Sequence, residues 1–319
     1  MIVDVVQRWR GRRSSYRPVG ELMRFDPARH EVACIDGPGA DTTARAFVVE
    51  HHYARSMGAA RERVGLYRGG VLVGLAVFTM PSQVKVLDHL PCPREVSVEL
   101  GRLVMLDSVE ANGESWFIAR ALELLRSRGF EGIVSHADPV PRTNLAGEEV
   151  KPGHIGRIYQ ASNAVYTGVA TARTVRLLPD GSVFNERTRS KIRGRERGWR
   201  HAVDQLVAAG AAPPEHTGAA ADLHDWLRVE LPRVTRPLKH PGNFRYLIGL
   251  TPWVKRHLPK GMPYPKLTLA GRTPRSPHGH ARDVRPHGAT SAATSGARLV
   301  TSDGAPERAP LSGPAPTPQ

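Results

Sequence analysis

Charged side chains stand at two places in the sequence where packing alone would not require them. Arg102 lies within the apolar run LGRLVML, and Asp138 directly follows the apolar stretch FEGIVSHA. A buried guanidinium needs a carboxylate, phosphate or carbonyl partner, and strands of open α/β sheets usually present functional groups from their carboxyl ends. Both residues are therefore predicted to lie in a functional site, although Arg102 could instead pair with Asp138 for purely structural reasons.

Imidazole and phenol groups accompany these charges. His52-Tyr53 is one pair, and the segment GHIGRIYQASN (153–163) contributes Tyr159. Histidine, a carboxylate and one or two tyrosines suit acid–base chemistry, and the same groups could bind a hard, oxidisable metal such as iron. His52, Tyr53, Asp138 and the residues of this segment, Tyr159 among them, are therefore candidates for acid–base chemistry or for metal binding. The competing interpretation is that each histidine is a hydrogen-bonded packing residue.

A phosphate-bearing donor would need a separate binding element. The segment Asn112-Gly113-Glu114-Ser115 opens an amphipathic helix that ends at Gly129. The unpaired N–H groups and positive dipole end of a helix N-terminus attract phosphate. We predict that Asn112, Gly113, Ser115 and Arg102 bind the cofactor. Asn112 could instead be an ordinary helix cap.

The elements that must position these residues follow from local patterns. Two apolar runs joined through Arg68-Gly69-Gly70 predict a β-hairpin, and residues 95–106 predict a central strand in which Gly101 marks a bulge or a close approach of a ligand. A helix-like stretch covers 51–62, a buried strand 130–138, a short helix 153–168, and a strand with a tight turn 171–184. This order is typical of acyltransferases of the GNAT type. It predicts an α+β fold with a mixed central sheet flanked by helices.

The electrical balance points to a polyanionic partner. Forty-five Lys and Arg against thirty Asp and Glu give a net charge of +15, which favours nucleic acid, although an Arg-inflated composition would give the same number. The segment RTRSKIRGRERGWR carries a cation at every second residue from 187 to 197. On a helix these cations would form a wide basic surface for phosphates. The predicted DNA-binding residues are Arg187, Arg189, Lys191, Arg193, Arg195, Arg197, Trp199 and Arg200. The alternative is a solvated basic face.

A second basic stretch, residues 231–247, carries Arg233, Arg236, Lys239 and Arg245 with aromatic residues between them. Such a pattern suits contact with the DNA backbone and stacking on bases. Together with the preceding helix it predicts a basic helical C-terminal extension.

Composition suggests how the chain divides. We predict an N-terminal extension (1–45), a main domain (46–267) with its catalytic core at about 46–178 and its basic part at about 179–267, and a tail (268–319). The tail is rich in Pro, Gly, Ala, Ser and Thr and has no aromatic residue, so it is predicted to be disordered.

The remaining bulk features indicate a protein of the cytoplasm. No apolar run is long enough to span a membrane, and the N-terminus lacks the order of charges of a secretory signal. Cys34 and Cys92 are the only cysteines, too few for a disulfide scaffold or a thiolate zinc site. The oligomeric state stays open, a homodimer included.

Several of these segments together resemble a known family. HHYARSMG, ELGRLVML, NGESWF, SHADP, GHIGRIYQASNAVYTG, HPGNFRYL and PYPK are similar to the Mom DNA-modification proteins of phage Mu and related phages, over about residues 46–267. The resemblance implies a GNAT-like enzyme that adds a carbamoylmethyl group to N6 of adenine in double-stranded DNA and so protects the DNA from restriction in the cytoplasm of the bacterial host. It also implies iron, and acetyl-CoA or a related donor, as cofactors.

The resemblance assigns roles at matching positions. It implies that His52, Tyr53, Asp138 and Tyr159 surround a metal or the reacting group, and that Arg102 and Ser115 lie near the donor. Asn163 and Tyr166 also match, without an implied role. Two other functions remain open from the residues: an acetyltransferase acting on a protein or small-molecule amine, and a DNA-binding protein without catalysis.

Overall fold

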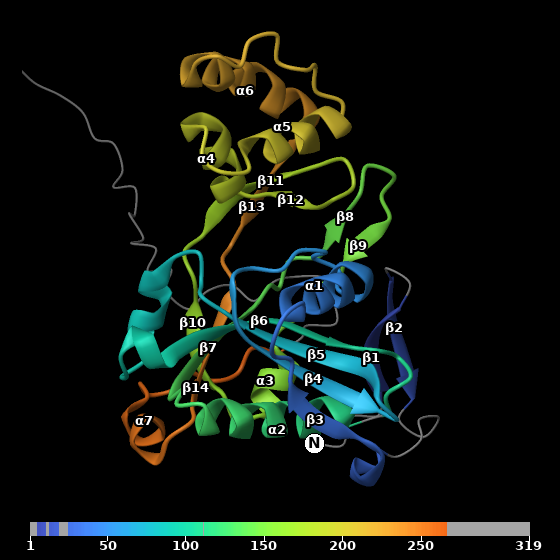
Figure 1. The fold of residues 1–319 in the computed structure, drawn as a ribbon, viewed down its shortest axis with the longest axis vertical. Helices are drawn as coiled ribbons and strands as arrows, with labels where there is room; N and C mark the ends of the chain where they lie inside the picture. Colours follow the sequence, from blue (N-terminus) through green and yellow to red (C-terminus); the bar gives the residue numbers. More distant parts are fainter. Residues whose placement is uncertain (1–4, 11–12, 19–24, 111, 267–319) are drawn as a thin grey trace, which may run out of the picture. The chain divides into compact units, whose positions relative to one another are not determined.

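The computed structural model describes residues 5–10, 13–18, 25–110 and 112–266 (Figure 1). The predicted tail (268–319) lies outside the described residues. In the part of the chain that is described, no helix is both long and apolar enough to cross a membrane.

A seven-stranded mixed sheet forms the centre of the fold, in the order β10-β14-β7-β6-β5-β4-β3. All neighbouring strands are antiparallel except β6 and β7, which are parallel. The strands are β3 (Glu31–Cys34), β4 (Ala60–Arg68), β5 (Val71–Thr79), β6 (Ser97–Met105), β7 (Gly132–Ala137), β10 (Val165–Val169) and β14 (Phe244–Gly249). The predicted α+β class with a mixed central sheet is confirmed.

The hairpin predicted at Arg68-Gly69-Gly70 joins β4 to β5. Gly69 and Gly70 have φ values of +56° and +77°, which residues with a Cβ rarely adopt, so the glycine pair permits the tight reversal. Residue 34 of β3 pairs with residue 64 of β4, so part of the predicted N-terminal extension is the edge strand of the central sheet.

Helices cover both faces of the sheet (Figure 1). Helix α1 (Ala40–His51) packs Ala44 and Val48 against one face, and α2 (Gly113–Ser127) packs its apolar stripe against the other. The helix-like prediction for 51–62 was wrong, because α1 ends at His51 and the chain then turns into β4. The predicted boundary at residue 45 falls within α1.

Beyond α1, short helical segments cover the same face over β7 and β14. These are η3 (Val84–His89), η4 (Arg94–Val96) and α7 (Pro252–His257). Leu87 and Val254 from these segments pack against Val134 and Leu247 of the sheet. The short helix α3 (Arg157–Ala161) packs on the opposite face, together with α2.

The strands β6 and β7 part from one another near their middle. Their parallel pairing runs from Ser97↔Gly132 to Leu100↔Ser135 and then stops, although β6 continues to Met105 alongside β5. This opening is the feature on which the candidate site is built.

Two strands lead out of the central sheet to a helical region (Figure 1). A three-stranded sheet, in the order β12-β11-β13, consists of β11 (Arg173–Leu177), β12 (Val183–Phe184) and β13 (Arg236–His240). The helices that follow are α4 (Glu186–Gly194), α5 (Trp199–Ala208) and α6 (Ala220–Val234), with their own apolar core. Two pairs of short strands, β1 (Val5–Arg10) with β2 (Arg13–Pro18) and β8 (Arg142–Thr143) with β9 (Glu149–Lys151), and the turn η2 (Pro27–Arg29), complete the described elements.

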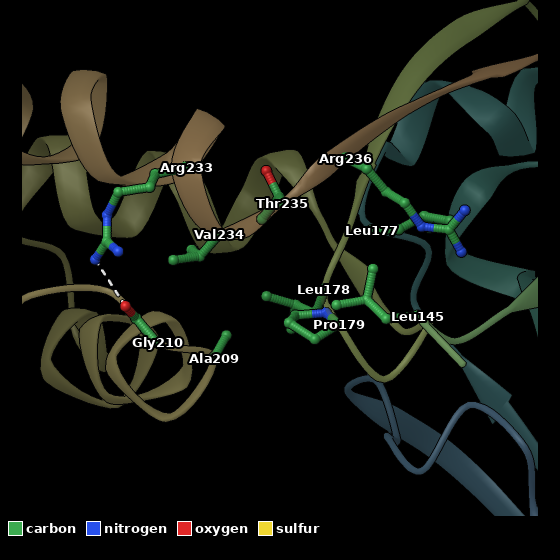
Figure 2. A pocket seen from close by; sticks show the side chains of 10 residues that line it. All are labelled: Leu145, Leu177, Leu178, Pro179, Ala209, Gly210, Arg233, Val234, Thr235 and Arg236. Carbon is green, nitrogen blue, oxygen red and sulfur yellow. Dashed lines mark hydrogen bonds between the residues drawn. The ribbon is translucent and has the colours of Figure 1, made fainter. Parts of the chain in front are cut away.

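A pocket of about 320 Å³ lies where β11 and β13 meet the helical region (Figure 2). Its lining residues are Leu145, Leu177, Leu178, Pro179, Ala209, Gly210, Arg233, Val234, Thr235 and Arg236. None of them belongs to the predicted catalytic, cofactor or metal set.

Candidate active site

A bulge at Gly101 decides which face of the sheet Arg102 occupies. Val77 pairs with Arg102 while Phe78 pairs with Leu100, so Gly101 is the extra residue. Leu100 packs on the α2 face, whereas Val77 packs on the α1 face, and Arg102 therefore points toward α1. A Cβ at position 101 would lie 2.7 Å from Oγ1 of Thr79, so the tight bulge requires glycine. The sequence prediction of a bulge is confirmed.

Arg102 is anchored by the segment that follows α1. Its guanidinium donates to the carbonyl oxygen of Ser56 at 2.6 Å, to Oγ of Ser56 at 3.2 Å and to its neighbour Gly101 at 2.6 Å. Burial lowers the pKa of Arg102, and the phenols of Tyr53 and Tyr159 lie close enough to influence it. These bonds leave the cation facing the two tyrosines, and the alternative pairing with Asp138 is not formed.

Asp138 is held by several partners at the end of β7. Its Oδ1 accepts from His240 Nε2 at 2.9 Å and from the backbone N–H of Val140 at 3.0 Å, and its Oδ2 lies 2.6 Å from Arg142 and 3.2 Å from Lys151. Burial acts to raise the pKa of Asp138, but the His240 hydrogen bond and the two cations outweigh it and hold that pKa well below its usual range. Asp138 is therefore ionised at neutral pH, and we call it and its partners Arg142, Lys151 and His240 the Asp138 bracket.

Lys151 is the member of this bracket that sequence reasoning missed. The residue is 2% exposed, and its ammonium group donates to three backbone carbonyls, those of Asp138, Val140 and Pro152. Burial lowers its pKa from 10.5 to about 8, although the carboxylate of Asp138 opposes the shift. No local pattern marks a lysine that will be buried.

His240 is the other partner that the sequence left without a role. It is 3% exposed, and its Nδ1 accepts from the N–H of Gly242 at 3.0 Å, so the proton on Nε2 is directed at Asp138. Since His240 ends β13, it ties the strand that carries the helical region to the candidate site. The segment HPGNFRYL, quoted for the family resemblance, already contained this histidine.

His52 is a neutral hydrogen-bond donor. Its Nδ1 accepts from the N–H of Ala54 at 3.0 Å, so the ring proton lies on Nε2. Burial, aided by the charges of Arg102 and of Lys151, lowers the pKa of His52 from 6.5 to about 3. The ring lies 4.2 Å from the ring of Tyr53, centroid to centroid. Burial and the nearby phenol of Tyr159 raise the pKa of Tyr53 to about 12.

Tyr159 and His154 complete the cluster, by which we mean His52, Tyr53, Arg102, His154 and Tyr159. Burial raises the pKa of Tyr159, whose hydroxyl is hydrogen-bonded to Ser135 at the parting of β6 and β7. Burial and the charge of Lys151 lower the pKa of His154 from 6.5 to about 4. The ring of His154 forms no hydrogen bond with any described residue.

The predicted iron site does not fit these residues. No group of three or more His, Cys, Asp or Glu side chains in the described part of the chain is arranged to hold a metal ion. Both oxygens of Asp138 and Nδ1 of His52 are already engaged, the phenol pKa values are raised, and three cations surround the site. Hard cations prefer free, anionic oxygen ligands, so we derive no step through a metal.

The predicted cofactor residues separate into two groups. Arg102 lies in the cluster, whereas Asn112, Gly113 and Ser115 form the start of α2. Gly113 is needed for packing, since a Cβ there would lie 2.7 Å from Val109, and its N–H donates to Glu110. Ser115 donates to the backbone of Asn112, whose φ of +73° is left-handed and whose side chain does not cap the helix. Within the described residues these three share no contact with the cluster.

The prediction that the cations of residues 187–200 lie along one helix was wrong. Residues 187–200 are not one helix, because α4 ends at Gly194, Arg195 adopts a left-handed φ of +48°, and α5 begins at Trp199. Trp199 is 8% exposed and belongs to the core of the helical region. Within this region several arginines pair with carboxylates: Arg187 with Glu196, and Arg189 and Arg193 with Glu186.

The second basic stretch also differs from its prediction. Its aromatic residues Phe244 and Tyr246 are buried in the central core and are closed to bases. Arg233 pairs with Glu230, Arg236 donates to the backbone of residue 143, and Arg245 donates to Thr167. Tyr166 is likewise a core residue, and Asn163 supplies the left-handed φ of +56° after α3.

The sheet order, the parting of β6 and β7, and the buried polar cluster beside it define a GNAT-like protein with a candidate active site. A model of the Mom protein family matches residues 37–266, and the chain belongs to that family. No curated protein matches the chain significantly.

Solved structures with a similar fold are acetyltransferases. A tandem GNAT protein from the clavulanic acid biosynthesis pathway is 12% identical, with a TM-score of 0.37 over 70% of this chain and 99% of that one. The aminoglycoside 6'-N-acetyltransferase of Enterococcus faecium is 11% identical, with a TM-score of 0.33 over 70% and 98%. An acetyltransferase of Bacillus subtilis in complex with CoA is 10% identical, with a TM-score of 0.30 over 70% and 99%.

Proposed function

We propose that this protein modifies the N6 amino group of adenine in double-stranded DNA, adding the carbamoylmethyl group that the family resemblance implies, in the cytoplasm of a bacterial host. The observation that carries the proposal is the convergence of His52, Tyr53, Arg102, His154 and Tyr159 beside the opening between β6 and β7. Membership of the Mom family supports DNA as the substrate.

The opening suits an acyl donor that is carried on an extended chain. Beyond Leu100, β6 pairs with β5 on one side and leaves its other edge without β7. An exposed strand edge binds amide-containing chains through backbone hydrogen bonds, and the arm of coenzyme A contains such amides. We therefore propose that an acyl-CoA binds here. Acyl transfer itself would join N6 to the carbonyl carbon and release the CoA thiol, so the carbamoylmethyl product also requires a nitrogen donor and a bond between N6 and the CH₂ carbon.

The target adenine must reach the cluster from within a duplex. Enzymes that act on a base inside duplex DNA extrude it into a pocket, at a cost of about a few kcal/mol. Neutral phenols stack on bases and donate hydrogen bonds to ring nitrogens, and Tyr53 and Tyr159 are neutral because burial raises their pKa values. Both tyrosines can therefore orient the base.

The two histidines of the cluster have different capacities. His52 presents an N–H, since its Nδ1 is occupied, and so can donate to an oxygen that gains negative charge. His154 is neutral and has no hydrogen bond to a described residue, so it can accept the proton that N6 loses when its new bond forms. Arg102 supplies a fixed positive charge in a poorly solvated site, which stabilises the same developing charge.

The nature of the product can be read directly. A carbamoylmethyl group joins N6 through a CH₂ carbon, whereas acetyl transfer would join it through the carbonyl carbon. The two substituents differ in mass by one NH group. Mass spectrometry of nucleosides therefore distinguishes the family product from plain acetylation.

The test is to express the chain in a bacterium, digest the DNA to nucleosides and search for a heavier deoxyadenosine. We expect the modified nucleoside with the parent chain and at least about a hundredfold reduction with His154→Gln, the lower end of the range of general base catalysis. His201→Gln, an exposed histidine on α5, is the matched control and should modify DNA as the parent does. Unmodified DNA with a folded parent chain would refute the proposal, and acetylation of small amines without DNA would favour an amine acetyltransferase instead.

A further inference from the structure

Helix α7 exposes a large aromatic ring. Thr251 caps the helix by accepting from the N–H of Val254, and Pro252 occupies the first turn, where its missing N–H costs nothing. Val254 and Leu258 face the core, which turns Trp253 and His257 outward on the opposite side. Trp253 is 48% exposed.

The indole ring is held in place before any partner arrives. Its centroid lies 4.3 Å from that of the His257 ring, at an interplanar angle of 23°, and Nδ1 of His257 donates to the carbonyl of Trp253 at 2.8 Å. A ring that is already fixed loses little conformational entropy when a partner binds.

Cationic side chains stand near Trp253 in the sequence, on α7 and directly after it. Lys255, Arg256 and Lys260 are exposed, and none of them forms an ion pair within the described part of the chain. Residues 250–266 contain no Asp or Glu. We call Trp253, Lys255, Arg256, His257 and Lys260 the α7 surface. Unpaired cations beside an aromatic ring are complementary to the phosphates and sugars of nucleic acid.

The α7 surface lies on the same face of the central sheet as Arg102. Val134 of β7 and Val254 of α7 pack together on this face, and α7 follows the end of β14 that pairs with Gly132. Asp138 follows the opposite end of β7, whose six residues span roughly 20 Å. About six base pairs of duplex cover that length, since base pairs stack every 3.4 Å or so.

We infer that the α7 surface is a second contact of this protein with duplex DNA, binding phosphates several base pairs from the modified adenine. This inference rests on the proposed function, because it assigns a binding surface to the same substrate. It adds a contact to the helical region, where Arg187, Arg189 and Arg193 pair with Glu186 or Glu196, because no carboxylate in the described part of the chain pairs with Lys255, Arg256 or Lys260.

The test measures binding of the full chain to a fluorescein-labelled duplex by anisotropy at several salt concentrations. In the triple variant Lys255→Gln, Arg256→Gln, Lys260→Gln we expect at least about tenfold weaker binding at about 0.1 M salt. The slope of log K against log salt concentration should be smaller in magnitude by about two to three units. The matched control removes Arg187, Arg189 and Arg193 by substitution with Gln and should change the slope by less than about one unit. Trp253→Ala should weaken binding about fivefold without changing the slope.

Unfolding transitions of the variants verify that each is folded. The inference is overturned if the folded α7 triple variant binds DNA like the parent, or if the α4 variant loses the larger slope. Binding of the α7 surface to anionic lipid vesicles but not to duplex DNA would also overturn it. Failure of the proposed function has a different signature, namely unmodified nucleosides from a parent chain that still binds DNA through α7.

Discussion

Two groups of ionised side chains in this protein are built from the same residue types and differ in burial. At the end of β7 the carboxylate of Asp138 is enclosed by Arg142, Lys151 and His240. On α4 the carboxylate of Glu186 is exposed between Arg189 and Arg193. Coulomb attraction is strong where water is excluded and weak where it is present. The contribution of an ion pair to stability therefore depends on its exposure to water and not on the types of residue that form it.

The largest expected effect is at the buried group. Asp138→Asn removes the charge that compensates Lys151 and Arg142, and we expect it to lower the free energy of unfolding by about 3–5 kcal/mol. Chemical denaturation measures the loss. Asp204→Asn, at an exposed position of α5, is the control and should stay within about 0.5 kcal/mol of the parent. Equal effects of the two substitutions would show that the bracket around Asp138 contributes no special stability.

The second prediction concerns pH. Because the pKa of His154 is lowered from 6.5 to about 4, the unfolded chain binds its proton first, and the stability present above pH 6.5 is lost as the pH falls from 6.5 toward 4. His154→Gln should reduce the slope of unfolding free energy against pH in this range by about 1.4 kcal/mol per pH unit. His201→Gln should leave the slope as it is. A parent slope that His154→Gln does not change would contradict the buried, neutral state of this ring.

A third prediction tests the bulge that turns Arg102 toward the buried group. Gly101→Ala places a methyl group 2.7 Å from Oγ1 of Thr79, so we expect a loss of about 1–3 kcal/mol and weaker DNA modification. Adding Thr79→Ala removes the obstructing atoms and should restore part of both. A double variant that is no better than Gly101→Ala alone would place the strain elsewhere.

The smallest effect is expected on α4. Arg189→Ala and Arg193→Ala should each change the free energy of unfolding by about 0–1 kcal/mol, the range of exposed ion pairs, and the change should shrink further at high salt. Thermal unfolding at low and high salt measures it. A loss comparable with that of Asp138→Asn would mean that α4 is far better shielded from water than its exposure indicates.

Much of the fold followed from local patterns. The hairpin at residues 68–70, the strand with its bulge at Gly101 and the amphipathic helix that ends before Gly129 depend on neighbours within a few residues, which the sequence displays. The helix misplaced at 51–62 shows the limit of such patterns, because the small residues on which that prediction rested lie past the point where α1 ends.

Part of the candidate site could also be predicted from the sequence. The unusual positions of Arg102 and Asp138 and the family resemblance identified the residues Arg102, Asp138, His52, Tyr53 and Tyr159. The partners of Asp138 come from 142, 151 and 240, and no local pattern can report which distant residues the strands will bring together.

By itself, the sequence determined several elements of this protein, its membership of a family and an excess of positive charge, because each of these is a property of neighbouring residues or of their sum. The tertiary structure alone decided which charges are paired and which are available. It enclosed Asp138 among cations, paired three arginines of α4 with carboxylates and left Lys255 and Arg256 of α7 without an ion pair to any described residue. Electrostatic energy depends on distance and on exclusion of water, and only the folded chain sets both.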